Sequence, residues 1–453
     1  MKGDFSRFSF DPSKHFTRVL QQQGRVQLDA DWNEQAAIFL HYTRTLTTDL
    51  IGAHGGPADE RNSDGMVMRR NLGFALIPYK EIDNQLSELT DAQREQLKKD
   101  WVNDDFVITK GRYYVQGLLA ESEGYYGLYN QPDYPWSEKA KLQEGRYLMY
   151  LDVWEHHISH VEDDSIREVA LEGADTTTRA KLIWQVKAKA VDKNFGGAAT
   201  NEIENKSELW QQLDADFYPK DRGWLKVIAK YEGKNEPCVS SPQAAYRGLE
   251  NQLYRVEIYQ QGSEFFAKWS RDNASTATKA QLLGNLVKVN DPRGFVAGQW
   301  LEITTNKQDL RGRAGPLFQI KKVEGNELFL DDPHAELPED STDEEFHELK
   351  VRRWDGVGLT TKESNTQWQV LADGIKIQFQ PPKFSTANRY ATGDYWVIPV
   401  RTATGTVEWP ENTALPPHGI DHYYAPLALI DTTGEAGTAL ELRRAFAPLA
   451  TDL

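Results

Sequence analysis

The order of apolar and polar positions along the chain predicts a mainly β protein. Short runs that alternate apolar and polar residues recur from about residue 64 to residue 430, with glycine-containing turns between many of them. This two-residue period is typical of strands that bury one face. Helical periodicity is convincing only near residues 31–51 and 86–99. We therefore expect many short strands and few helices.

Two hairpins are predicted from local turn residues. Residues 106–118 form one hairpin in this interpretation, with Lys110-Gly111 at the turn, and residues 246–275 form another, with Gln260-Gln261-Gly262 near its turn. Glycine favours these turns because it accepts backbone angles that other residues avoid. Residues 145–159 read as a strong strand, and Gly173 marks a turn before the next strand.

The chain is too long for one compact core, so several domains are expected. Residues 1–62 are predicted to form an N-terminal extended arm and amphipathic helix. Residues 63–280 are predicted to form the main β domain, with an irregular insert at about 193–240. Closely spaced strands at 281–337 predict a small SH3-like barrel. The remaining β region, 338–453, is expected to pack back on the main β domain.

The opening fifty residues differ from the rest of the chain. Residues 16–35 read as an extended segment, a turn at Gly24-Arg25, a second extended segment and a helix start, which Asp29 or Asp31 could cap. The following helix carries one apolar stripe, and Gly52 is expected to end it. The stripe consists of Trp32, Ala36, Phe39, Leu46 and Leu50. We expect this arm and helix to dock onto something, which need not belong to the same chain.

Charge and cysteine content exclude several functions. The formal net charge is −16, and a nucleic-acid groove needs a basic stripe that the sequence lacks. The single cysteine, Cys238, excludes an intramolecular disulfide and fits a reducing cytoplasm. The first residues lack the apolar core of a secretory signal, and no run approaches 18 apolar residues. Membrane contact is therefore expected only through partners.

Candidate catalytic or metal-binding residues do not form a specific motif. His156, His157 and His160 lie close together in the sequence, but His156 and His160 would share one face only in a helix, and a strand end is predicted there. His418 and His422 have the same four-residue spacing, in a run of prolines and aromatic residues. Nucleotide-binding, serine-hydrolase and metalloprotease signatures are absent. We therefore predict no enzyme activity, no metal and no cofactor. Abundant carboxylates and aromatics keep a glycan-active protein as the alternative.

Two short motifs, residues 268–273 and 352–356, pair arginine with tryptophan and aspartate. An arginine can stack on indole while binding a carboxylate, which would fix a corner between domains; a sugar-stacking tryptophan is the alternative. The predicted corner residues are Trp269, Arg271, Asp272, Arg353, Trp354 and Asp355.

The run "HFTRVLQQQGRVQLDADWNEQ" resembles the opening of an uncharacterised bacterial family associated with phage-tail-like contractile injection systems. Four later stretches resemble the same family: "YLDVWEHHISHVED" with "REVALEGADTTTRAKLIWQVK", "YRGLENQLYRVEI" with "FAKWSRDNAS", "RRWDG", and "ATGDYWVIPVRTATGTVEWP". Together they extend the resemblance over most of the chain. The "EHHISH" run is richer in histidine than that family's pattern, and residues 193–240 match nothing in it.

The resemblance implies a structural subunit, such as a peripheral baseplate extension or cage, or an adaptor. It also implies partners among the baseplate, tube, sheath or cap subunits of the particle, and rings of three or six copies. After assembly in the cytoplasm and release, the chain would be extracellular or membrane-attached as part of the particle. The residues expected to organise docking are Phe5, Phe8, Phe10, Phe16, Arg18, Arg25, Asp29, Trp32, Glu34 and Phe39, with the two arginines binding carboxylates and Trp32 as the buried anchor. A glycan-binding or glycan-cleaving tail-tip protein is the main alternative function, and a secreted effector is a third.

Overall fold

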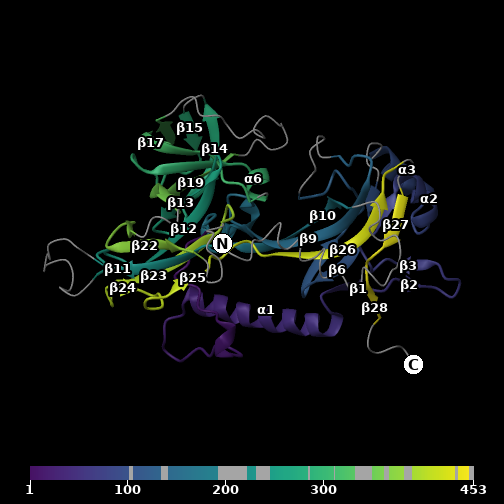
Figure 1. The fold of residues 1–453 in the computed structure, drawn as a ribbon, viewed down its shortest axis with the longest axis horizontal. Helices are drawn as coiled ribbons and strands as arrows, with labels where there is room; N and C mark the ends of the chain where they lie inside the picture. Colours follow the sequence, from purple (N-terminus) through teal and green to yellow (C-terminus); the bar gives the residue numbers. More distant parts are fainter. Residues whose placement is uncertain are drawn as a thin grey trace.

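The computed structural model shows a mainly β protein, as the sequence predicts (Figure 1). Two β sandwiches lie side by side, a barrel sits on one of them, and a long helix runs beneath both (Figure 1). Within the described part, no helix combines the length and apolar character needed to cross a membrane. The structure describes residues 1–100, 106–133, 141–191, 222–230, 245–283, 286–310, 312–331, 349–361, 367–381, 390–433 and 437–447.

The first sandwich joins residues from both ends of the chain. A four-stranded sheet of long strands, in the order β10-β9-β26-β27, packs against a second four-stranded sheet, β28-β1-β6-β7, and a three-stranded sheet, β4-β5-β8, around one apolar core. The strands are β1 (His54–Pro57), β4 (Leu76–Pro78), β5 (Phe106–Ile108), β6 (Gly111–Val115), β7 (Leu118–Ser122), β8 (Tyr126–Gly127), β9 (Arg146–Ile158), β10 (Arg179–Ala190), β26 (His422–Asp431), β27 (Gly437–Glu441) and β28 (Ala445–Phe446).

The second sandwich has its own apolar core between two sheets, ordered β21-β22-β11-β25 and β20-β13-β12-β23-β24. Its strands are β11 (Trp224–Ala229), β12 (Gln252–Gln261), β13 (Glu264–Ser270), β20 (Gly356–Thr360), β21 (Gln369–Val370), β22 (Ile375–Gln380), β23 (Tyr395–Arg401), β24 (Thr406–Val407) and β25 (Ala414–Leu415). The hairpin of β12 and β13 confirms the predicted turn near Gly262.

A closed barrel is inserted in the sequence between β13 and β20. Each strand pairs with two neighbours in the order β14-β15-β18-β17-β16-β19, and a third apolar core fills the interior. Its strands are β14 (Ala277–Leu283), β15 (Leu286–Val289), β16 (Trp300–Thr304), β17 (Leu317–Glu324), β18 (Glu327–Leu330) and β19 (Leu349–Trp354). The barrel thus takes in β14 and β19, which extend beyond the predicted range 281–337.

The cores cut across the other predicted domain ranges. Range 63–280 supplies strands to the first sandwich, the second sandwich and the barrel, and range 338–453 does the same. Most of the predicted insert at 193–240 lies outside the described residues, as does the acidic stretch 338–348. The described residues 222–230 correct the interpretation of that insert as irregular, because β11 pairs with β22 and β25.

Helix α1 (Asp29–Ile51) confirms the predicted N-terminal helix and ends at Gly52, whose φ is 91° and whose N–H donates to Thr48 O at 2.8 Å. The predicted capping is wrong. Leu28 is the N-cap and makes no side-chain capping bond. Asp29 lies inside the first turn, where its negative charge still complements the helix dipole.

The second predicted helix, at residues 86–99, is also corrected. Helix α2 (Ile82–Gln85) ends before Leu86, and α3 (Asp91–Asp100) begins only after a break. Thr90 N–H donates to Gln93 Oε1 at 3.0 Å, and Gln93 N–H donates to the Thr90 hydroxyl at 3.3 Å. This reciprocal capping starts a new helix at Asp91, because it satisfies donors that a continuous helix would bond internally.

The predicted hairpin at residues 106–118 has a different turn. β5 pairs with β4 and β8, whereas β6 pairs with β7. Gln116 and Gly117 form the true hairpin turn, with φ of 48° and 77°, as a two-residue turn between twisted strands requires. A side chain at Gly117 would collide with the backbone of Arg44 in α1, so this turn also fixes where α1 rests.

The remaining elements are short. β2 (Glu60–Arg61) and β3 (Val67–Arg69) form a two-stranded ribbon. The single-turn helices are η1 (Pro12–Lys14), η2 (Tyr79–Glu81), η4 (Asp164–Ile166), η5 (Val169–Leu171) and α6 (Asn306–Leu310).

Candidate docking site

The first eleven residues, called here the anchor segment, begin where the two sandwiches and the barrel meet and run from there to α1 (Figure 1). Lys2 Nζ lies 3.0 Å from Glu257 Oε1, and Asn273 Nδ2 donates to Gly3 O at 2.9 Å. Arg401 Nη2 donates to Ser6 O at 3.2 Å. These contacts come from the second sandwich and its connection to the barrel, so the anchor segment is held by its own chain.

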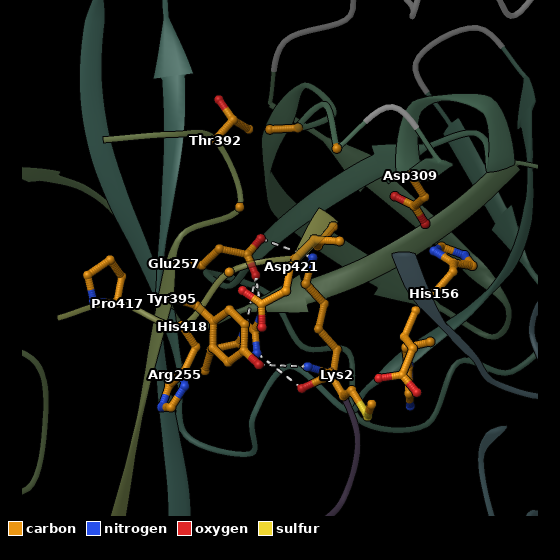
Figure 2. A pocket seen from close by; sticks show the side chains of 18 of the residues that line it. Lys2, His156, Arg255, Glu257, Asp309, Thr392, Tyr395, Pro417, His418 and Asp421 are labelled. Atoms are coloured by element: carbon orange, nitrogen blue, oxygen red, sulfur yellow. Dashed lines mark hydrogen bonds and ion pairs between the residues drawn. The ribbon is translucent and has the colours of Figure 1, made fainter. Parts of the chain in front are cut away.

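A cavity of about 680 Å³, with many charged residues in its lining, opens beside the anchor segment. Figure 2 shows side chains from separate elements facing each other across it: Lys2 from the anchor segment, Glu257 from β12, His156 from β9 and Asp309 from α6. The cavity therefore marks the junction of all the large units rather than a pocket within one of them.

A buried cluster of charges, the junction cluster, forms part of the wall of the cavity. Lys268 is fully buried, with Nζ 2.6 Å from Glu302 Oε1 and 3.4 Å from Glu257 Oε1. Trp354 Nε1 donates to Glu302 Oε2 at 2.8 Å. The members are Lys2, Arg255, Glu257, Lys268, Glu302 and Trp354. Charges this deeply buried need partners, and here β12, β13, β16 and β19 supply them.

Carboxyl groups at the junction are held ionised. Burial alone would raise the pKa of Glu257, but Lys2, Arg255 and Lys268 together hold it well below its usual value. Burial likewise opposes ionisation of Glu162, yet Lys350, whose Nζ lies 2.7 Å away, lowers its pKa to about 2. The pKa of Asp309 is lowered against burial by the same lysine. A glycosidase acid needs a raised pKa, so these three carboxyls are poorly suited to that role.

The histidines predicted as weak metal candidates have other surroundings. Burial lowers the pKa of His156, and burial with nearby positive charge lowers that of His157 to about 3. His160 Nδ1 lies 3.0 Å from Asp175, and His422 Nδ1 lies 2.7 Å from Asp152. His418 packs on Tyr395. Among the described residues, no group of three or more His, Cys, Asp or Glu is placed to hold a metal ion.

Residues 15–28, called here the exposed segment, leave the body after the anchor segment (Figure 1). Phe16, Leu20 and Val26 are 55%, 69% and 82% exposed. Val19 N–H donates to Gln35 Oε1 at 2.8 Å and Arg25 N–H to Gln22 O at 3.3 Å. The described hydrogen bonds include no other backbone N–H donor from residues 16–27. This segment therefore offers both apolar side chains and free backbone groups.

Helix α1 continues this exposed surface. Trp32, Phe39, Leu46 and Leu50 are 65%, 60%, 60% and 64% exposed. The opposite side of the helix is attached to the body through buried Ala30 and Ile38 and through an Arg44–Glu155 ion pair of 2.8 Å. Trp32, predicted to be a buried anchor, is thus not buried within this chain.

The other predicted docking residues divide into two groups. Phe5 packs on Phe8 and His157, and Phe10 packs on His41, so all three aromatic anchor-segment residues contact their own chain. Phe16, Trp32 and Phe39 face solvent. Some residues of the predicted set therefore attach the N-terminal segment to its own chain, and the others form an exposed surface.

The charged members of the predicted set also differ from one another. Asp29 accepts the Ser6 N–H at 2.9 Å, and Glu34 accepts the Ser9 hydroxyl, so both tie the anchor segment to α1. Arg18 and Arg25 are exposed, and among the described residues neither guanidinium has a carboxylate partner. The carboxylate pairing expected for these two arginines does not form within the chain.

The two corner motifs meet each other. Arg353 Nη2 lies 2.7 Å from Asp272 Oδ2, and the Arg271 N–H donates to Asp355 Oδ2 at 2.8 Å. Asp355 N–H in turn donates to Trp269 O at 2.9 Å. The polar groups thus pair between motifs, joining β13 of the second sandwich to the end of β19 in the barrel. Both tryptophans of this corner, Trp269 and Trp354, are buried.

Sequence reasoning missed most of the junction cluster. Arg255 and Glu257 alternate with Tyr254, Val256 and Ile258, which face the core of the second sandwich. Such alternation normally indicates a solvent face for the polar residues. The anchor segment and the barrel cover the face that carries Arg255 and Glu257. The sequence around Lys2 and Glu302 contains no pattern that predicts this burial. Only the paired charges at positions 255 and 257 hinted at this contact.

Comparison with known proteins gives one match. No curated protein and no solved structure matches the chain. Residues 1–61, 84–218 and 188–451 match a family whose function is unknown. Because these matches cover most of the sequence, the protein belongs to this family of unknown function, DUF6519.

Proposed function

We propose that the protein is a structural subunit of a phage-tail-like contractile injection system, in a peripheral baseplate extension or cage, or as an adaptor. The exposed segment and α1 bind neighbouring subunits, while the sandwiches and barrel form a rigid body. The chain assembles in the cytoplasm, in rings of three or six copies, and reaches the cell exterior with the particle. The assignment to a particle rests on the sequence resemblance. The docking surface is supported by the exposed apolar residues of the structure.

The observation that carries this proposal is the concentration of exposed apolar side chains near the N-terminus. Twelve of the twenty exposed large hydrophobic side chains among the described residues belong to residues 1–50. Burying one such side chain is worth about 1.5–3 kcal/mol, so a surface of this kind favours association. A partner that covers it gains binding energy which this chain alone does not obtain.

The exposed segment suits binding by strand addition. It has no helix or strand on either side of the turn at Gly24, and in an extended backbone Phe16, Arg18 and Leu20 would share one face. A sheet edge in another subunit could pair with its free backbone groups while apolar pockets receive alternate side chains. Arg18 and Arg25 would then find carboxylates on that subunit.

The anchor segment holds the exposed segment in a defined position for a partner to bind. Its bonds to Glu257, Asn273 and Arg401 fix the start of the chain, and α1 fixes the other end. The exposed segment is therefore held at both ends, which reduces the entropy lost when a partner binds.

The test uses full-length protein in cells that assemble the particle. A triple variant, Phe16→Ser, Leu20→Ser and Val26→Ser, removes apolar side chains that contribute little to the isolated fold. Particles are purified with stringent washing, and mass spectrometry measures this chain relative to the sheath subunit. We expect a fixed ratio for the wild type and at least a tenfold loss for the variant.

Val169→Ser is the matched control, because Val169 is 86% exposed but lies in η5, outside the N-terminal surface. It should enter particles at the wild-type ratio. Absence of the wild-type chain from particles, together with polysaccharide binding or turnover by the purified protein, would reject the structural role and favour a glycan-active tail-tip protein.

A further inference from the structure

The exposed face of α1 has a heptad repeat. Six residues follow one another at spacings of four, three, four, three and four positions, and all six are exposed. We call them the α1 seam: Trp32, Ala36, Phe39, Thr43, Leu46 and Leu50. Spacings of this kind average 3.5 residues, which is the period of a helix that packs along another helix.

The α1 seam points away from the body of its own chain. Ala30 and Ile38, the buried residues of α1, lie outside the seam, and Arg44 binds Glu155 from the same attached side. Figure 1 shows α1 beneath both sandwiches, with the N-terminal part of the chain passing below the start of the helix. Because all six seam residues are exposed, a second helix can reach the seam.

The sizes of the seam residues identify the second helix. In an antiparallel pair of two α1 helices centred on His41, Trp32 faces Leu50, Ala36 faces Leu46 and Phe39 faces Thr43. Each small residue then meets a large one. A parallel pair would instead stack Trp32 on Trp32 and Ala36 on Ala36, alternating overpacked and empty layers.

We propose that α1 pairs antiparallel with α1 of a second copy of this chain, giving a dimer with twofold symmetry. A twofold interface uses the same surface on both subunits and must complement itself, which the α1 seam does. The flanking positions are Asn33, Gln35, Leu40, Tyr42, Thr47 and Asp49. Asp49 of one copy lies beside Gln35 of the other, so no like charges oppose the pairing.

The dimer names a second copy as the partner of α1, which the proposed function gives only as a neighbouring subunit, and it does not depend on membership of a particle. The exposed segment contributes no residue to the α1 seam and meets a flanking position through the Val19–Gln35 bond, so its apolar side chains stay open to other subunits. A chain that belonged to no particle would still form this dimer, and a particle subunit could instead use α1 for a different helix. Failure of one proposal therefore leaves the other standing.

Disulfide trapping tests the orientation. Cys238, the single cysteine, is first replaced by alanine, and then Trp32→Cys and Leu50→Cys are introduced together. Within one helix the two positions are about 27 Å apart at 1.5 Å per residue, too far for a disulfide. Mild oxidation should convert the double variant to a covalent dimer, while each single variant stays uncrosslinked.

Light scattering on the full-length protein tests the dimer itself. The wild type should have twice the mass of one chain at tens of micromolar. Leu46→Lys should halve that mass, whereas Thr45→Lys should not, because Thr45 is an exposed neighbour outside the seam. Circular dichroism and thermal unfolding of both variants check that the fold is kept.

Three results would overturn the proposal. A monomeric wild type at these concentrations would exclude a second copy as the occupant. Crosslinking of Leu50→Cys alone would indicate a parallel pair. Equal masses for Leu46→Lys and the wild type would place the interface elsewhere on the molecule.

Discussion

The junction cluster and the α1 seam both depart from the usual sorting of side chains, in opposite directions. The junction cluster places Lys268, Glu302 and Glu257 in the interior, whereas the seam places Trp32 and Phe39 in solvent. Every charge in the cluster has a partner in the same chain. The apolar seam residues face solvent, and no other part of the described chain covers them.

This difference separates two reasons for an unusual residue position. A buried charge is tolerated when the fold itself supplies its counter-charge, because an unpaired ion would cost several kcal/mol. An exposed apolar surface carries no such internal compensation and favours association with another molecule. Substitutions in the cluster should therefore change folding, and substitutions in the seam should change association.

The largest effect is expected for Lys268→Met. The substitution keeps the length of the side chain but leaves Glu302 and Glu257 without their shared buried cation. We expect a loss of about 3–5 kcal/mol in the free energy of unfolding, measured by denaturant titration. The control, Lys322→Met, breaks a largely exposed pair with Glu324 and should cost less than about 1 kcal/mol. Equal costs would contradict a folding role for the cluster.

A second test follows the Glu162–Lys350 pair with pH. The pKa of Glu162 falls from 4.5 unfolded to about 2 folded, so the folded state favours the ionised form. Its contribution, about 3 kcal/mol, is present above pH 4.5 and is lost as the pH falls toward 2. Between pH 5 and pH 3 the wild type should lose roughly 2 kcal/mol more stability than Glu162→Gln. Parallel pH profiles would show that this pair does not contribute.

Trp354→Phe should have an intermediate effect. It removes the indole N–H that donates to buried Glu302, and it leaves a void beside Lys268. We expect a cost of about 2–3 kcal/mol in thermal or denaturant unfolding. Trp409→Phe removes a comparable indole bond to Thr413 O near the surface and should cost less than about 1 kcal/mol. The opposite ranking would place the stabilising contact outside the cluster.

The smallest effect on folding is expected in the seam. Phe39→Ser exchanges an exposed side chain, so the unfolding free energy of the monomer should change by less than about 0.5 kcal/mol. The unfolding free energy is measured by denaturant titration of samples dilute enough that sedimentation shows a monomer. The exposed Tyr42→Ser is a neighbouring control. A loss above about 2 kcal/mol for Phe39→Ser alone would mean that Phe39 is buried in its own chain.

Local patterns predicted several elements well. The apolar stripe and Gly52 defined α1 to within two residues, and Gly262 marked the turn between β12 and β13. Prediction failed where two local signals competed. Lys110-Gly111 resembled a hairpin turn, but Gln116-Gly117 was the turn whose strands could pair. Thr90 and Gln93 start a helix at a point where hydrophobic periodicity alone ran on from residue 86.

The candidate site was predicted only in part. Trp32 and Phe39 were identified from their helical spacing and Phe16 from its place in the predicted extended arm, and all three are exposed in the structure. Their separation from Phe5 and Phe10, which contact the body, could not be predicted, because apolar residues have the same pattern whether their cover comes from the same chain or from another. The corner motifs were found as units, but their pairing with each other was not.

The sequence by itself determined the mainly β class, α1 with its apolar stripe, and the two arginine–tryptophan–aspartate motifs, because each depends on residues close together in the chain. The tertiary structure decided which strands share a core, how the barrel interrupts the second sandwich, and that Arg255 and Glu257 face a buried junction. Those outcomes depend on contacts between segments more than a hundred residues apart, such as Lys2 with Glu257. A polar face looks the same locally whether water or another domain covers it.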